Sequence, residues 1–175
     1  MSVEKLLEFR LRKDTFFASS QSPLAAELRQ DFAGLKYFDP NPSLEFQVRL
    51  EPVSNVEHIA METSSGVRKF FVRAGRLEFQ IEGQSVQLTA YSNPETDDTD
   101  LFIPFRDATS GSETYGSGRY LDTELEPDGS LVLDFNLAYN PYCAYSDGWS
   151  CPIPPLENWL KVPVRAGEKT YGAAA

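Results

Sequence analysis

The sequence lacks any long apolar segment. No apolar run approaches the roughly 20 residues of a membrane-spanning helix. Charged residues interrupt the N-terminal segment 1–14 every two or three positions, which excludes a secretory signal peptide there. An Asn-x-Ser/Thr acceptor for glycosylation is also missing, since Pro42 blocks the nearest candidate at Asn41. These absences together predict a cytoplasmic protein.

Basic residues are scarce relative to acidic ones. The 175 residues include 16 Lys and Arg against 26 Asp and Glu, which gives a net charge of −10. A surface this acidic repels phosphate backbones and anionic lipids, so we expect neither nucleic acid nor a membrane as partner. A local group of basic side chains remains able to bind a small anion.

Cysteine and histidine are nearly absent. The chain has two cysteines, Cys143 and Cys151, and one histidine, His58. A structural zinc site usually shows two close pairs of ligands, so we expect no cofactor; zinc on the two cysteines would also need Asp147, Glu157 or His58. A catalytic cysteine would need His58 beside it in space. A disulfide could close this loop, although the predicted compartment favours two buried, reduced thiols.

The length and composition fit one domain spanning 1–175. The 41% hydrophobic and 13% aromatic content is that of a globular protein. Within this domain we place N-terminal helices at 1–36 and an antiparallel β core at 44–165.

Helical periodicity is confined to the N-terminal part. Apolar residues recur there at three- and four-residue spacing, which predicts an amphipathic helix over 3–17 whose apolar face flanks a sheet. The residues of that face are Val3, Leu6, Leu7 and Leu11. A second short helix is predicted to open at Ser22-Pro23, a serine cap followed by a proline in the first position, and to end near Gly34. The two would form a helical hairpin.

From Leu44 the hydrophobic period changes to that of half-buried strands. Strands are predicted at 44–51, 56–63, 67–73, 76–82, 85–92, 101–105, 119–126, 130–137 and 159–165. Ala74-Gly75 would join two of them as a compact hairpin, and Pro104, which lacks a donor, would put its strand at an edge or a bulge. The pattern indicates a mainly β protein, an antiparallel β-barrel or sandwich of about eight strands with an N-terminal helical hairpin.

The glycine-rich loop 107–118 has the composition of a phosphate-binding loop. No Gly-Lys-Ser/Thr follows it, and it joins strand to strand, so a P-loop is excluded. Arg119 comes next, at the mouth of a strand, where a guanidinium can clamp a carboxylate or phosphate. The alternative is a structural arginine that pairs with Asp107, Asp122 or Asp134.

Three tyrosines fall within seven residues at 139–145. Their rings could form an aromatic wall with polar tips over a cavity, or they could anchor a long loop to the core; both interpretations stay open. The ligand-binding set predicted from this stretch is Tyr115, Arg119, Asn136, Tyr139, Tyr142 and Tyr145.

Asp134 and Glu157 are the candidate catalytic carboxylates. Either could serve as the base of a hydrolase with Arg119 as an electrostatic clamp, although Glu157 could equally anchor an arginine. Three hypotheses follow: a small-molecule binding β-domain that favours a small, partly apolar anion, a hydrolase, and a structural or interaction protein without a pocket.

Three segments, 104–122, 134–160 and 162–169, resemble a bacterial and archaeal family of uncharacterised proteins, the domain of unknown function numbered 1684. The resemblance covers most of the chain. It rests in particular on Tyr115, Gly116, Gly118, Arg119, Tyr120, Cys143 and Cys151. It implies a cytosolic bacterial or archaeal protein, and it brings no reaction and no cofactor.

Overall fold

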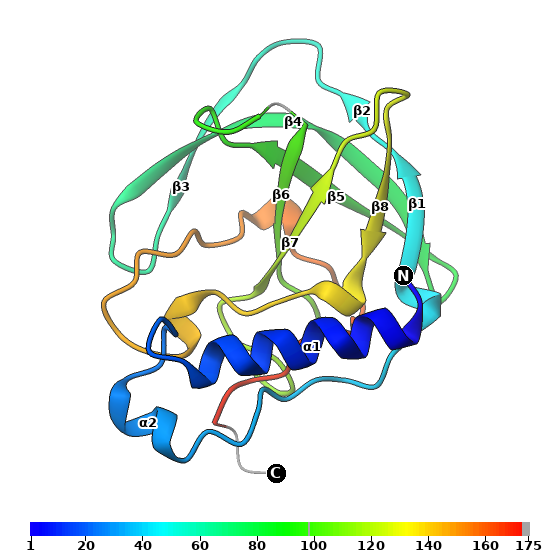
Figure 1. The fold of residues 1–175 in the computed structure, drawn as a ribbon. Coiled ribbons are helices and arrows are strands. Elements are labelled where there is room, and N and C mark those ends of the chain that lie inside the picture. The colour runs from blue at the N-terminus through cyan, green and yellow to red at the C-terminus, as the bar shows by residue number, and fades with distance from the viewer. Residues whose placement is uncertain (98, 173–175) are drawn as a thin grey trace.

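The protein is described by a computed structural model over residues 1–97 and 99–172 (Figure 1). In these residues eight strands form most of the regular secondary structure, and the long helix α1 (Val3–Ala18) runs across one end of them. None of the helices in this part of the chain has the length and apolar character needed to cross a membrane.

Helix α1 confirms the helix predicted over 3–17, but the predicted apolar face is wrong. Leu6 is buried, whereas Leu7 and Leu11 are 51% and 68% exposed. The inward face instead carries Arg10, whose guanidinium donates to the carbonyl of Phe38 at 3.0 Å. The inward face therefore combines the apolar side chains of Leu6 and Phe17 with one buried polar contact.

Helix α2 (Ala26–Gln30) is a little over one turn long. The start predicted at Ser22-Pro23 is wrong, because the Ser22 hydroxyl accepts a hydrogen bond from the backbone N–H of Leu24 at 2.9 Å and so closes a local turn before the helix begins. The N-terminal region is thus one long helix followed by a short one.

Two antiparallel sheets are present. In the smaller, β1 (Glu45–Arg49) pairs with β8 (Ser130–Asp134). The larger has the order β2-β4-β5-β6-β7, with β3 also paired to β4. Its strands are β2 (Glu51–Pro52), β3 (His58–Glu62), β4 (Arg68–Ile81), β5 (Gln84–Ser92), β6 (Asp100–Phe105) and β7 (Arg119–Glu124). Short 3₁₀ helices lie in the connections: η1 (Pro42–Leu44), η2 (Phe135–Leu137), η3 (Tyr142–Ala144) and η4 (Leu156–Asn158).

This arrangement confirms a mainly antiparallel β protein with a helix near its N-terminus. Within the described residues no strand ladder joins the two sheets, so no closed barrel is found. The choice between barrel and sandwich is not confirmed.

The hairpin predicted at Ala74-Gly75 is wrong, because β4 runs through these residues as one strand of 14 residues. A β-bulge lies between Arg73 and Gly75. A Cβ at Gly75 would lie 2.4 Å from the carbonyl oxygen of Glu51, so this glycine permits the close approach of β2. The chain turns instead at Glu82 and Gly83, both with positive φ.

The side chain of Asn158 fills a gap between β5 and β6. These strands pair only at Tyr91↔Phe102 and Ser92↔Leu101, and then separate. Beyond that point Asn158, which is 0% exposed, accepts from the backbone N–H of Thr89 at 2.7 Å and donates to the carbonyls of Thr89 and Pro104, both at 2.8 Å. The strand that carries Pro104, β6, is therefore not an edge strand. Pro104, which has no backbone N–H to donate, lies where β6 is not paired with the backbone of β5.

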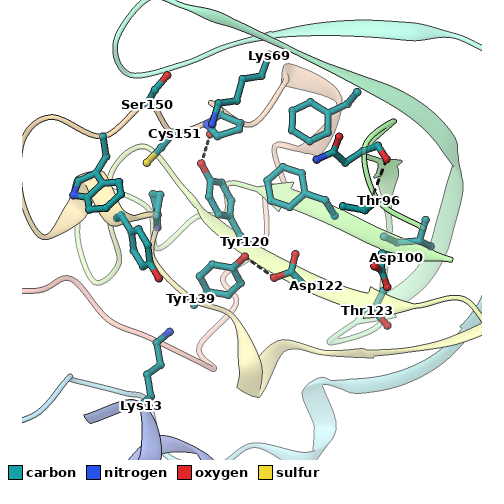
Figure 2. Close-up of a pocket in the computed structure, with 18 of the residues that line it drawn as sticks. Lys13, Lys69, Thr96, Asp100, Tyr120, Asp122, Thr123, Tyr139, Ser150 and Cys151 are labelled. Atoms are coloured by element: carbon teal, nitrogen blue, oxygen red, sulfur yellow. Dashed lines mark hydrogen bonds between the residues drawn. The ribbon is translucent and has the colours of Figure 1, made fainter. Parts of the chain in front are cut away.

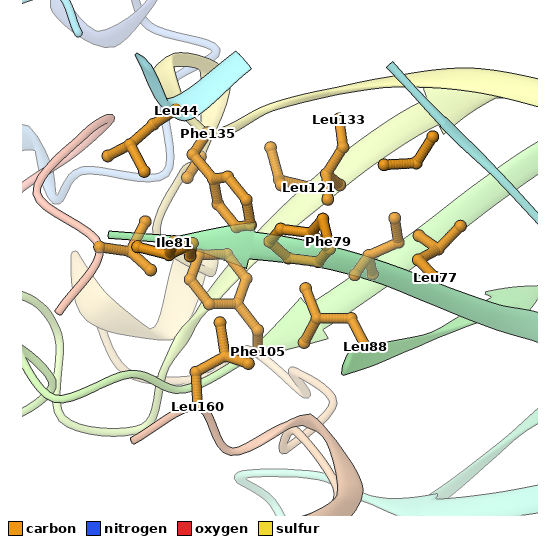
Figure 3. Packing of buried hydrophobic residues seen from close by; sticks show 14 of the residues in the cluster. Leu44, Leu77, Phe79, Ile81, Leu88, Phe105, Leu121, Leu133, Phe135 and Leu160 are labelled. Atoms are coloured by element: carbon orange, nitrogen blue, oxygen red, sulfur yellow. The ribbon is translucent and has the colours of Figure 1, made fainter. Parts of the chain in front are cut away.

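The main hydrophobic core lies between the strands of both sheets. At its centre the ring centroid of Phe135 lies 5.8 Å from that of Phe79 and 5.3 Å from that of Phe105 (Figure 3). The strand predicted at 159–165 is wrong. Its backbone makes scattered hydrogen bonds to Arg106 and Ala108 rather than a ladder, and its alternate apolar side chains enter this core.

Candidate functional site

A cavity of about 1200 Å³ opens on the side of the larger sheet that faces away from the main core (Figure 2). Side chains alternate along β7, so Leu121 joins the core while Tyr120 and Asp122 line the cavity. Helix α1 forms a second side, and the loop 139–152 forms a third. The site is therefore built from segments far apart in the sequence.

Four rings form a continuous surface in this cavity, here called the aromatic wall: Phe71, Phe102, Tyr120 and Tyr139. Phe71 and Phe102 are stacked with centroids 5.3 Å apart. The edge-to-face pairs Phe102–Tyr120 and Tyr120–Tyr139 follow at 4.8 and 5.7 Å. A planar or apolar ligand would find both ring faces and ring edges here.

The tyrosine hydroxyls of the wall are bonded within the protein. Tyr120 donates to the carbonyl of Pro152, and Tyr139 donates to Oδ2 of Asp122 at 2.6 Å. Burial raises the pKa of both tyrosines well above the ordinary value, so both remain neutral donors. The pKa of Asp122 is also raised, first by desolvation, which the Tyr139 hydrogen bond opposes.

Three cationic side chains border the cavity. Lys13 of α1 pairs with the buried Glu168, and its Nζ lies 5.0 Å from the ring centroid of Tyr139. Arg12 and Lys69 also line the space, and within the described chain neither forms an ion pair. Two acidic residues, Asp100 and Asp122, lie at the same cavity, so its charge is mixed.

Both cysteines are free thiols beside this site. Cys151 lines the cavity, and its Sγ accepts a hydrogen bond from the backbone N–H of Cys143 at 3.4 Å. The Tyr115 hydroxyl lies 3.7 Å from Sγ of Cys143. Burial raises the pKa of Cys151 to about 11. Among the described residues no group of three or more His, Cys, Asp or Glu side chains is placed to hold a metal ion.

Arg119 does not line the cavity, although it was predicted to bind ligand. It is 0% exposed and pairs with Asp107, one of the three aspartates considered above, at 2.8 Å. It also donates to the carbonyls of Val164, Ala166 and Glu168. Burial lowers the pKa of Arg119, and the charge of Asp107 opposes this. The guanidinium therefore binds groups inside the protein and does not face the cavity.

Of the other predicted ligand-binding residues, Tyr139 and Tyr142 line the cavity, and the remaining three do not. Tyr145 is buried and donates to Glu168. Asn136 bonds with both backbone groups of Asn41, at 2.7 and 2.9 Å, and so ties η2 to the start of η1. The hydroxyl of Tyr115 contacts the sulfur of Cys143.

The two candidate catalytic carboxylates are held apart from the cavity by separate partners. Asp134 accepts from the backbone and side-chain nitrogens of Asn136 at 2.9 and 2.8 Å. Glu157 accepts two hydrogen bonds of 2.9 Å from Arg73 and another from Tyr91. The structure therefore does not bring Arg119, Asp134 and Glu157 together.

Several lining residues lay outside the sequence prediction. Alternation along the strands could have indicated Phe102 and Tyr120, because each lies opposite core-facing neighbours. Nothing local indicates Lys13 or Lys69, since α1 and β4, which carry them, meet at the cavity only in the folded chain.

Comparison with known proteins identifies a family and a similar solved structure. The family model described as "Protein of unknown function (DUF1684)" matches residues 30–169. The solution NMR structure of an uncharacterized protein from Haloarcula marismortui is 41% identical, with a TM-score of 0.74, over 98% of this chain and 95% of that one. No curated protein matches the chain.

Proposed function

The chain belongs to the DUF1684 family of proteins of unknown function, and from its cavity we propose that it binds a small, partly apolar anion against the aromatic wall. The observation that carries this proposal is the run of four packed rings at a cavity of about 1200 Å³. Ligand sites are typically concave and mostly apolar with a few polar groups, which is the composition found here.

The preference for an anion comes from Lys69 and Arg12. Both border the cavity, and neither has an ion-pair partner in the described part of the chain, unlike Lys13, which is paired with Glu168. A carboxylate or sulfonate on an otherwise apolar ligand would meet a cation at the edge of the aromatic wall. Asp100 and Asp122 disfavour a ligand with several negative charges.

A thermal-shift screen tests this proposal. Alkyl and aromatic carboxylates, such as octanoate and 2-naphthoate, are compared with their uncharged amides. Binding to the folded state alone raises stability by about 2.7 kcal/mol at a ligand concentration of 100 times Kd. We expect carboxylates to stabilise the protein more than the amides. Equal shifts for acid and amide, or no shift with either, would overturn the proposal.

A matched pair of variants locates the anion. Lys69→Gln removes the cation at the cavity, while Lys161→Gln removes an exposed lysine that does not line it. We expect Lys69→Gln to weaken carboxylate binding by about fivefold, about 1 kcal/mol for an exposed ion pair, and to leave amide binding unchanged. Lys161→Gln should change neither.

A hydrolase is not proposed, because each residue considered for that role has its own protein partners away from the cavity. Arg119 is paired with Asp107, and Glu157 with Arg73. For the compartment we propose the cytoplasm, which is supported by the two free thiols, the usual state of cysteine in a reducing environment.

A further inference from the structure

The two cysteines are in contact although seven residues separate them. The backbone N–H of Cys143 donates to Sγ of Cys151 at 3.4 Å. A disulfide needs the two Cβ atoms about 3.5–4.5 Å apart. One sulfur already lies against the backbone of the other cysteine, so the two side chains are close neighbours.

The surroundings hold one of these sulfurs in place and leave the other more accessible. The backbone of Cys151 exchanges hydrogen bonds with Ser64, in the turn after β3, at 3.0 and 3.1 Å. Cys143 lies in η3 and is half-buried, with the Tyr115 hydroxyl 3.7 Å from its sulfur. Figure 2 shows Cys151 at the cavity, next to the aromatic wall.

We propose that Cys143 and Cys151 form an oxidation-sensitive dithiol that hydrogen peroxide converts to a disulfide in the cavity wall. Cys143 attacks the peroxide, the O–O bond breaks, and a sulfenic acid and one water are formed. Sγ of Cys151 then attacks the sulfenic sulfur, the S–O bond breaks and a second water leaves. Two thiols lose two electrons and two protons, and the peroxide is reduced to water.

The order of attack follows from burial. Cys151 is the more buried thiol, and its pKa is raised to about 11, so little of it is thiolate at neutral pH. Cys143 is therefore the first to react. Cys151 resolves the sulfenic acid because it is the neighbouring sulfur.

The bond would tie together two parts of the cavity wall. Tyr142 is adjacent to Cys143, and Trp149 lies two residues before Cys151; their rings already pack edge to face at 4.9 Å. Both rings line the cavity. A disulfide would fix this loop, and the resulting change in ligand affinity rests on the proposed function, whereas the dithiol chemistry does not.

Intact-mass analysis of the full-length chain tests the dithiol. The reduced protein is treated with hydrogen peroxide, unfolded in N-ethylmaleimide and weighed without reductant. We expect a monomer that has lost two hydrogen atoms and taken up no maleimide, and that dithiothreitol returns to the doubly labelled form. The same protein in urea should form this species at least tenfold more slowly, because unfolding removes the contact.

Since the chain has only two cysteines, the outcomes are distinct. Two thiols that remain alkylatable while a reference thiol peptide is oxidised would overturn the proposal, as would a disulfide-linked dimer or equal rates in the folded and unfolded protein. Cys151→Ser should trap the Cys143 sulfenic acid as a dimedone adduct, and Cys143→Ser should give much less adduct. The reverse ratio would overturn the assigned order.

The fluorescence of Trp149 reports whether oxidation changes the cavity wall. In the Trp159→Phe variant, Trp149 is the one remaining tryptophan. Its fluorescence should change on oxidation and recover with dithiothreitol. This readout needs no ligand, so its result is independent of the carboxylate screen. A disulfide that forms without any change in emission would overturn the coupling to the wall.

Discussion

Arg119 and Asp107 form an ion pair in which both side chains are 0% exposed, with Nη2 and Oδ2 2.8 Å apart. The two terminal nitrogens of Arg119 also donate to three carbonyls of the segment 164–168. This contact joins the glycine-rich loop, the start of β7 and the C-terminal segment. It makes the arginine a structural link between them rather than a ligand at the cavity.

Arg119→Met should therefore destabilise the fold strongly. Removing one partner of a buried pair leaves the charge of Asp107 uncompensated, which lowers the free energy of unfolding by about 3–5 kcal/mol. Arg165→Met removes an exposed pair with Glu113 and should cost less than about 1 kcal/mol. Urea unfolding measures both. If Arg119→Met were as stable as Arg165→Met, the structural assignment would be wrong.

Asn158→Ala should open the seam between β5 and β6. It leaves the backbone of Thr89 and the carbonyl of Pro104 without partners, and we expect a loss of about 2–4 kcal/mol in the free energy of unfolding. Asn93→Ala is the control, since Asn93 caps only an exposed turn at Glu95. Hydrogen exchange should show faster exchange of the Thr89 amide; unchanged protection there would contradict the role given to Asn158.

Gly75→Ala should cost more than Gly66→Ala. The added methyl at Gly75 meets the Glu51 carbonyl at 2.4 Å, and overpacking of this kind costs about 1–3 kcal/mol. At Gly66 the space is open, so only the positive φ of 79° is penalised, by about 1 kcal/mol. Urea midpoints of the two variants give the comparison. A smaller loss at Gly75 would mean that β2 is not held as described.

The orientation of α1 can be tested with two leucines. Leu6→Ala creates a cavity on the buried face and should cost about 2–5 kcal/mol. Leu11→Ala alters a side chain that is 68% exposed and should stay within about 0.5 kcal/mol. Thermal or urea unfolding distinguishes them. A large effect at Leu11 would show that this face packs against something.

Cys151 should titrate unusually late. In the Cys143→Ser variant, burial should keep the pKa that governs its alkylation by iodoacetamide above the ordinary thiol value of 9.0 in the folded protein. The folded state holds this proton more tightly, so the stability it contributes is complete below the ordinary value and is lost as pH rises from about 9 to about 11. Alkylation with the same pH profile in urea would contradict the effect of burial.

Much of the fold could be predicted from local pattern. Alternation identified the strand regions that became β1, β3, β5, β6, β7 and β8, and helical spacing identified α1. What failed depended on distant partners. Ala74-Gly75 has the composition of a turn, but the close approach of Glu51 makes it a bulge. The apolar residues of α1 gave the wrong face because Arg10, a charged residue, is buried and donates a hydrogen bond to a carbonyl outside the helix.

The site could be predicted less well than the fold. The tyrosine-rich loop did supply Tyr139 and Tyr142, since exposed aromatic rings in a loop need a surface to pack on. Phe71, on β4, belongs to the same wall through its stacking on Phe102. The two rings lie on β4 and β6, which are separated by β5 in the sheet order, so no residue spacing along the chain predicts that they stack.

The contacts of Arg119 also constrain how the chain folds during synthesis. Its carbonyl acceptors at 164, 166 and 168 are made some 45 to 49 residues after the arginine itself. While those residues are still inside the ribosome, the guanidinium lacks these three acceptors, and of its side-chain partners only Asp107, which precedes it in the chain, has been synthesised. Domains fold as units once enough chain has emerged, and here the unit is complete only when residue 168 is free.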